Sequence, residues 1–167
     1  MAVLDRLRAE ARQYASGDDR PLGGYVALLA AYAVSGAGLA ALLVTRRKVP
    51  RLTAGDIALM SVATFKLSRV IARDPITSPL RAPFTSFEGP ADTPSELRET
   101  VRGSGLRKAV GELLTCPFCT GQWVATALIA GMLVAPRETR VATSLLTATA
   151  VADGLHLAYS AAASAGG

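Results

Sequence analysis

Long uncharged stretches dominate the hydrophobic pattern of this chain. Residues 22–44 contain no charged side chain over 23 positions, and residues 117–135 contain none over 19. Residues 141–163 form another apolar stretch, which includes Asp153 and His156. Because a helix needs roughly 20 apolar residues to cross a bilayer, each stretch predicts a membrane-spanning helix.

Residues 52–72 also show apolar positions at helical spacing, but they carry Asp56, Lys66 and Arg69. An isolated charge at the bilayer centre costs at least about 2.5–3.5 kcal/mol. Asp56 lies near one end of the stretch, and the long side chains of Lys66 and Arg69 near the other end can reach the headgroups. We therefore expect a second spanning helix here, with an interfacial or re-entrant helix as the alternative.

These segments predict an all-α integral membrane protein, a helical bundle with three to four transmembrane helices. We expect one membrane domain over residues 21–167, with helices at about 22–44, 52–72, 117–135 and 141–163. Residues 1–20 are polar, but apolar residues recur in them at helical spacing among arginines. They predict either a polar tail or a helix lying on the membrane surface.

The segment 73–116 is polar and interrupted by prolines, and we expect it to be ordered against the cytoplasmic membrane surface. Thr93 and Glu96 within it match a capping box, in which both side chains satisfy N–H groups at a helix start. This pattern predicts a helix that begins after Thr93. Pro136 and the charged residues that follow it predict a tight turn before the last apolar stretch.

The charge pattern predicts the orientation and the partner. The chain carries 18 Lys and Arg against 13 Asp and Glu, and its mean hydropathy is +0.32. The cations lie mostly beside the apolar runs, as the positive-inside rule describes, so we expect a lipid bilayer and no nucleic acid as partner.

Counting cations places the cysteines in the cytoplasm. With four spans and a cytoplasmic N terminus, the cytoplasmic side carries Arg6, Arg8, Arg12, Arg20, Arg73, Arg81, Arg98, Arg102, Arg107 and Lys108. The outer side carries Arg46, Arg47, Lys48, Arg51, Arg137 and Arg140. A three-span version has its N terminus outside, and the cysteines stay cytoplasmic. Both versions describe a multi-pass protein of the cell inner (plasma) membrane.

The two cysteines of the chain, Cys116 and Cys119, stand where the polar segment meets an apolar run. Pro117 suits the first turn of a helix, with Thr115 or Cys116 as its cap. Three residues apart on a helix, the thiols share one face, and the helix N-terminus favours thiolate. One interpretation is redox chemistry through a reversible disulfide.

Two other interpretations of the cysteines stay open. Zinc usually takes four ligands, so Cys116 and Cys119 would need further donors, from Glu112, Asp153 or His156 or, more freely, from the same pair in a second copy of a homo-oligomer. Alternatively, the cysteines are small packing residues at a helix start, where Gly121 allows close approach and Trp123 anchors near the interface.

The charges inside the apolar stretches predict an ion pair. If the stretches 52–72 and 141–163 run parallel, Lys66 and Asp153 lie at similar depth, with Arg69 one turn further on. Pairing Asp153 with Lys66 or Arg69 lowers the cost of burying each charge. A functional alternative is an ion or proton path through Asp56, Asp153 and His156.

Residues 114–123, Leu-Thr-Cys-Pro-Phe-Cys-Thr-Gly-Gln-Trp, resemble the core of an uncharacterised bacterial membrane family, the domain of unknown function 1360. The blocks Ala63–Arg69, Arg73–Asp74 and Leu80–Phe84 are similar to its upstream part. The resemblance covers roughly residues 52–160. It implies a small integral membrane protein, in some spore formers linked to sporulation, and it supplies no activity, cofactor or catalytic residue.

The sequence lacks the common hydrolase and nucleotide-binding patterns, GxSxG, HExxH and the P-loop, and it has one histidine. We therefore expect a non-enzymatic scaffold or accessory subunit that meets a protein partner through residues 73–116. The alternatives are a thiol-based membrane redox protein using Cys116 and Cys119, and a small carrier using Asp153 and His156.

Overall fold

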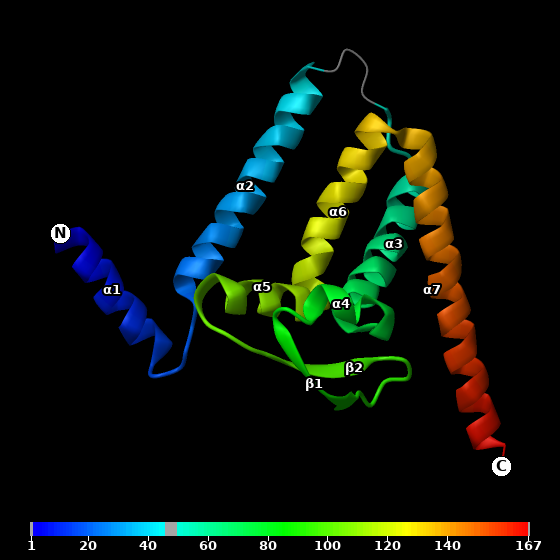
Figure 1. Cartoon of the computed structure of the whole chain (residues 1–167). Helices are drawn as coiled ribbons and strands as arrows, with labels where there is room; N and C mark the ends of the chain where they lie inside the picture. Colours follow the sequence, from blue (N-terminus) through cyan, green and yellow to red (C-terminus); the bar gives the residue numbers. More distant parts are fainter. Residues whose placement is uncertain (1, 46–49, 167) are drawn as a thin grey trace.

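The computed structural model describes residues 2–45 and 50–166. Arg46, Arg47 and Lys48, which were counted for the orientation, lie outside these residues. Four long helices make up most of the fold (Figure 1): α2 (Leu22–Thr45), α3 (Ala54–Arg73), α6 (Pro117–Val134) and α7 (Pro136–Ala165). The chain runs away from the polar segment along α2 and α6, and it returns along α3 and α7.

Three of these helices, α2, α6 and α7, are long and apolar enough to cross a membrane. The mostly helical membrane fold predicted from the apolar runs is therefore confirmed. The charged helix α3 is 20 residues long and lies lengthwise beside α6 and α7, not across their ends (Figure 1). Residues 1–20 include a helix, α1 (Ala2–Ala15), and its location on the membrane surface stays a prediction.

The core lies where α3 packs between α6 and α7. Met60 and Ala63 of α3 are buried there, as are Val124 and Met132 of α6. By contrast, Gly24 is the buried residue of α2, and the apolar side chains along the rest of that helix are largely exposed. This exposure is expected for a helix whose surroundings are lipid.

The connection between α6 and α7 differs from the one predicted. The tight turn expected at residues 136–140 is wrong, because these residues already form the first turns of α7, which begins at Pro136. Proline at the first helical position removes an N–H that would have no helical partner, so the helix starts there without penalty. The connection is Ala135 alone, and Gly131 allows Thr139 to pack against α6.

The polar segment folds into a compact unit at one end of the bundle, here called the cap (residues 75–115). It contains the 3-10 helix η1 (Pro75–Thr77), α4 (Ser78–Arg81), the strands β1 (Thr85–Pro90) and β2 (Leu97–Val101), and α5 (Gly105–Thr115). The two strands pair antiparallel, with Thr85 opposite Val101 and Phe87 opposite Glu99.

The helix predicted to begin after Thr93 is wrong, because residues 91–96 connect the two strands of this hairpin. The Glu96 N–H does bond to the Thr93 carbonyl, but Ser95 has a positive φ of 63°, which does not continue a helix. The Glu96 carboxylate accepts a hydrogen bond from Arg69 of α3 instead of capping. Tertiary contacts therefore override the local capping pattern.

A fully buried arginine, Arg81, joins the cap to the bundle. Its Nε and Nη2 donate to the two carboxylate oxygens of Glu99 on β2 at 2.8 and 3.0 Å. Its Nη1 donates to the Ile71 carbonyl of α3 and to Thr77 Oγ1, both at 2.7 Å. Its Nη2 also donates to the Asp74 carbonyl at 3.1 Å. One guanidinium thus bonds α3, the turn that follows it and the hairpin.

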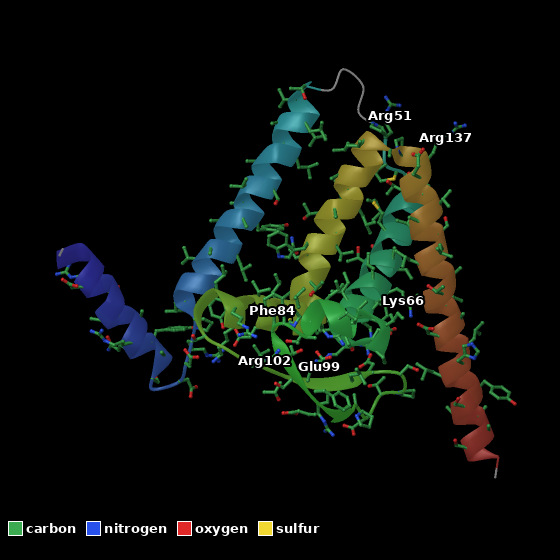
Figure 2. All side chains as sticks on the ribbon, in the orientation of Figure 1. Arg51, Lys66, Phe84, Glu99, Arg102 and Arg137 are labelled. Atoms are coloured by element: carbon green, nitrogen blue, oxygen red, sulfur yellow. The ribbon has the colours of Figure 1, made fainter. Side chains whose placement is uncertain are left out.

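The electrostatics of Glu99 follow from this contact. Burial alone raises the pKa of Glu99, but hydrogen bonds from Arg81 and Thr85 outweigh that effect and hold the pKa below its usual value. A backbone hydrogen bond joins the two ends of the hairpin nearby, because the Arg102 N–H donates to the Phe84 carbonyl at 2.9 Å. Figure 2 shows Phe84, Glu99 and Arg102 together in the cap.

Gly111 provides a first test of the packing of the cap. A Cβ at this position would lie 2.7 Å from Val101 Cγ1 and 3.1 Å from the Phe84 carbonyl oxygen. We expect Gly111→Ala to destabilise the detergent-solubilised chain by about 1–2 kcal/mol, because overpacking outweighs the gain in helix propensity. Gly154→Ala in α7, where no atom lies within 4 Å of the added Cβ, serves as control. Equal SDS unfolding midpoints for both variants would contradict the close packing.

The stability of the chain at acid pH tests the role of the buried pair of Arg81 and Glu99. A carboxyl group whose pKa is lower in the folded protein stabilises the fold above its ordinary pKa, and this stabilisation is lost as the pH falls through the folded value. We expect the unfolding midpoint of the full chain to fall below pH 4.5, the ordinary value for Glu99. Glu99→Gln should lose about 3 kcal/mol at neutral pH and show a flatter acid profile, since it leaves Arg81 buried without its counter-charge.

The control for acid pH is Glu88→Gln, which alters an exposed glutamate of the same hairpin. It removes a carboxylate charge from the hairpin without altering the pair of Arg81 and Glu99, and it should keep the stability of the unaltered chain at neutral pH. A Glu99→Gln variant with unaltered stability and profile would overturn the role assigned to the buried pair.

Candidate functional site

The cysteines sit at the start of α6, as predicted. Cys116 is the N-cap residue, and its Sγ accepts a hydrogen bond from the Cys119 N–H at 3.2 Å. Pro117 occupies the first helical turn, whereas Thr115 bonds back to the Gly111 carbonyl of α5. Both thiols are free, with Cys116 partly buried and Cys119 exposed. Exposure of Cys119 allows an external thiol or oxidant to reach it.

The described residues do not gather a complete metal site around these thiols. Among them, no group of three or more His, Cys, Asp and Glu side chains is placed to hold a metal ion. The nearby Glu112 accepts a hydrogen bond from Tyr25 of α2. Cys116 and Cys119 would thus supply two of the four ligands that zinc usually takes, and a zinc site stays a prediction that needs donors from a second copy.

The ion pair expected between the two parallel helices is present. Lys66 Nζ of α3 lies 2.5 Å from Asp153 Oδ2 of α7. Thr147 supports the same parallel alignment nearly two turns earlier, because its hydroxyl donates to the Leu59 carbonyl at 3.1 Å. The side chain of Lys66 is 20% exposed and that of Asp153 is 53% exposed. The pair therefore lies at the edge of the bundle and not in its core.

Arg69 has a different partner from the predicted one. It does not join Asp153 but forms an ion pair with Glu96 in the connection between β1 and β2. Its guanidinium also lies 5.6 Å from the centroid of the Phe65 ring, a cation–π distance. Arg69 therefore holds the hairpin against α3, a role that no local sequence pattern indicates.

Asp56, the other acid considered beside Asp153, makes structural hydrogen bonds. Its carboxylate accepts hydrogen bonds from the N–H and hydroxyl of Thr53, both at 2.9 Å, and from Arg140 of α7 at 2.8 Å. The Asp56 N–H in turn donates to Thr53 Oγ1 at 3.1 Å, which completes a capping box for α3. The spacing of Thr53 and Asp56 is a signal that sequence reasoning could have used.

Four predicted site residues meet in one groove, which we call the polar groove. It has a volume of about 830 Å³ and lies between α3, α7 and the hairpin connection. Its charged and titratable lining residues are Lys66, Arg69, Asp74, Glu96, Asp153 and His156. Asp56 and the cysteines are not among the residues that line it. Such a groove beside lipid can bind a polar headgroup or exchange protons with water.

A second polar cluster, unforeseen from the sequence, links α2 to α6. Gln122 Nε2 donates to the Tyr32 hydroxyl at 2.7 Å, and that hydroxyl lies 2.9 Å from Thr126 Oγ1. The rings of Tyr32 and Trp123 meet edge to face, with centroids 5.3 Å apart. Trp123 therefore packs against a neighbouring helix, and its role as an interface anchor stays a prediction.

Comparison with known proteins identifies what this chain is similar to. No solved structure matches the chain. The sporulation protein YjcA of Bacillus subtilis (strain 168) is 41% identical over 83 residues, which is 48% of this chain and 70% of that protein. The family described as protein of unknown function (DUF1360) matches residues 59–159, which include α6, the cap, most of α3 and most of α7. The chain therefore belongs to the DUF1360 family.

Proposed function

We propose that this chain is a non-enzymatic membrane component, a scaffold or accessory subunit that presents its cap to a protein partner at one face of the plasma membrane. The observation that carries the proposal is the burial of Arg81, whose hydrogen bonds to Glu99, Ile71 and Asp74 join the cap to α3. A surface held this firmly loses little conformational entropy when a partner binds.

Exposed apolar side chains on the cap support a protein partner. Phe87 on β1 is 66% exposed and Leu106 at the start of α5 is 54% exposed. Aromatic residues of this kind are enriched in the centres of protein interfaces, where they become buried on binding. We place the partner's contact at Phe87.

The proposed side is the cytoplasm. The cap and residues 1–20 carry nine of the ten cations counted for the cytoplasmic side, and the tenth, Arg73, ends α3 beside the cap. Loops rich in Lys and Arg stay in the cytoplasm. The name of the sporulation protein that resembles this chain makes spore formation the first process to examine in a spore-forming host.

A redox function is the second candidate. The hydrogen bond from the Cys119 N–H to Cys116 Sγ, which keeps both cysteines in one helical turn, supports it. Oxidation would join the two Sγ atoms and pass two electrons and two protons to an oxidant such as a disulfide or a membrane quinone. A carrier function has weaker support, because Lys66 compensates the charge of Asp153. The redox and scaffold functions make opposite predictions for two sets of variants.

The first set alters the cap. We expect Phe87→Ser to abolish complementation of a deletion strain, with protein abundance and unfolding midpoint unchanged, because the substitution removes an exposed contact and no core packing. Val141→Ser, at a position 71% exposed on α7, is the control and should complement fully. Full complementation by Phe87→Ser would contradict a contact at this position.

The second set alters the thiols. We expect the double variant Cys116→Ser, Cys119→Ser to complement fully, and differential alkylation in native membranes to find both thiols free. A reversible disulfide, combined with loss of function in either single variant, would contradict the scaffold proposal and establish the redox function. Stoichiometric zinc with both thiols blocked would instead indicate a metal site.

A further inference from the structure

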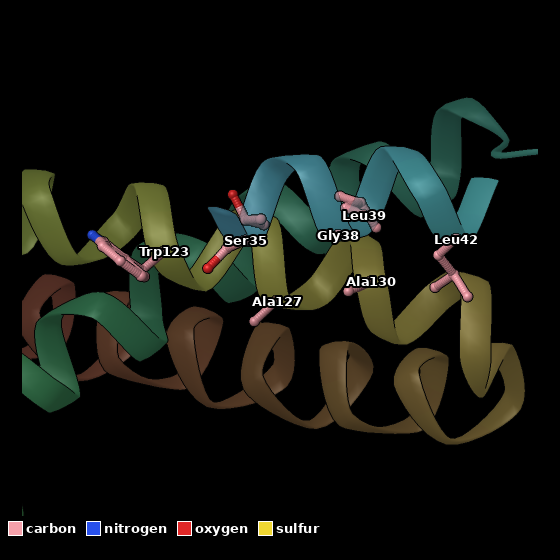
Figure 3. Close-up of a pocket in the computed structure, with 8 residues that line it drawn as sticks. Ser35, Gly38, Leu39, Leu42, Trp123, Ala127 and Ala130 are labelled. Carbon is pink, nitrogen blue, oxygen red and sulfur yellow. The ribbon is translucent and has the colours of Figure 1, made fainter. Parts of the chain in front are cut away.

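A groove between α2 and α6 lies within the part of the fold that faces lipid. It has a volume of about 390 Å³, and its lining includes Gly38, Leu39, Leu42, Trp123, Ala127 and Ala130. Figure 3 shows Gly38, Leu39 and Leu42 along α2 and Trp123, Ala127 and Ala130 along α6. We call this the α2–α6 groove. Both helices that form it are candidate membrane spans.

The α2–α6 groove exists because the two helices meet at one end of it through large polar and aromatic side chains. Tyr32 bonds to Gln122 and Thr126 and packs on Trp123, which fixes the distance between the helices. Beyond this point the lining includes the small residues Gly38, Ala127 and Ala130, which leave space beside Leu39 and Leu42. A Cβ built at Gly38 meets no atom within 4 Å.

Because the α2–α6 groove lies between two candidate membrane spans, we expect something to fill it. An apolar void within a bilayer loses the dispersion contacts that hydrocarbon would supply, so lipid enters wherever a chain can fit. Water is a poor occupant, because the lining is almost entirely apolar and offers few hydrogen-bond partners. The occupant is therefore apolar.

The size of the α2–α6 groove distinguishes a hydrocarbon chain from a protein helix. From Gly38 to Leu42, or from Trp123 to Ala130, the lining extends about 6–10 Å along a helix axis. A helix about 10 Å in diameter can insert only a ridge of its side chains into a groove of this volume, and the rest of the helix stays outside. An acyl chain is much thinner and fits.

We infer that the α2–α6 groove is a binding site for one acyl chain of a membrane phospholipid. The chain lies against Trp123 and the small residues opposite it, and it completes the contact between α2 and the rest of the bundle. This site is separate from the polar groove and from the cap, so it does not depend on the proposed scaffold function.

The sole tryptophan of the chain reports directly on this site. The full protein is reconstituted in phosphatidylcholine vesicles in which increasing fractions of the lipid carry bromine at mid-chain, and Trp123 fluorescence is measured. We expect strong quenching in the unaltered protein. Gly38→Leu should roughly halve the quenching, because its side chain fills the groove and excludes the acyl chain.

Gly36→Leu is the matched control, because it places the same side chain on another face of α2, outside the groove and with no atom within 4 Å of the added Cβ. It should leave quenching unchanged. Ala127→Leu, from the opposite wall, should act like Gly38→Leu, and helix content by circular dichroism verifies that each variant folds.

The inference is overturned if Gly38→Leu and Gly36→Leu quench equally. It is also overturned if the unaltered protein resists quenching while it self-associates, which would mean that a protein surface covers the groove. A Trp123 emission maximum typical of water contact would overturn it as well, since it would place water where the acyl chain is expected.

Discussion

The charge on Arg81 is the constraint around which the cap is built. A cation taken out of water without partners costs several kcal/mol, so a fully buried guanidinium needs an acceptor for each of its donors. The acceptors come from three places in the chain: the end of α3, the turn at residues 74–78, and Glu99 on β2. The same contacts that satisfy the charge therefore determine where α4 and the hairpin lie.

The predictions from the sequence that succeeded depend on distances along single helices. The lengths of the apolar runs predicted α2, α6 and α7, because the thickness of the bilayer sets a length that local sequence can match. The pairing of Lys66 with Asp153 followed from similar depth in parallel helices. Both inferences depend on one-dimensional distances along helices, which the sequence contains.

The failed prediction of a helix after Thr93, and the contacts that were not foreseen, depend on distant segments of the chain. Thr93 and Glu96 match a capping pattern. The Glu96 carboxylate, however, accepts a hydrogen bond from Arg69, which lies 27 residues earlier in the chain. The cluster of Tyr32 with Gln122 joins residues 90 positions apart, and no periodicity indicates it. The site residues were thus identifiable as charged or thiol groups inside apolar surroundings, whereas their partners were not.

The arrangement of charges favours a structural role for these residues over the transport of an ion. Asp56, Lys66, Arg69 and Asp153 each have an oppositely charged partner in a neighbouring element, and the three ion pairs that they form hold α3 to α7 or to the cap. Paired charges stabilise a fixed arrangement, and they are poorly prepared to carry a mobile ion. The helix α3 is accordingly the element that connects the membrane helix α7 to the cap.

Hydrogen–deuterium exchange of the full chain in lipid nanodiscs tests the central claim most directly, that the cap is a rigid unit held to the membrane bundle. The N–H groups of β2 that pair with β1 should exchange about a thousandfold more slowly than those of an unstructured peptide, with protection similar to that of α5. Exchange of β2 at the unstructured rate, beside protected helices α3 and α6, would contradict the account.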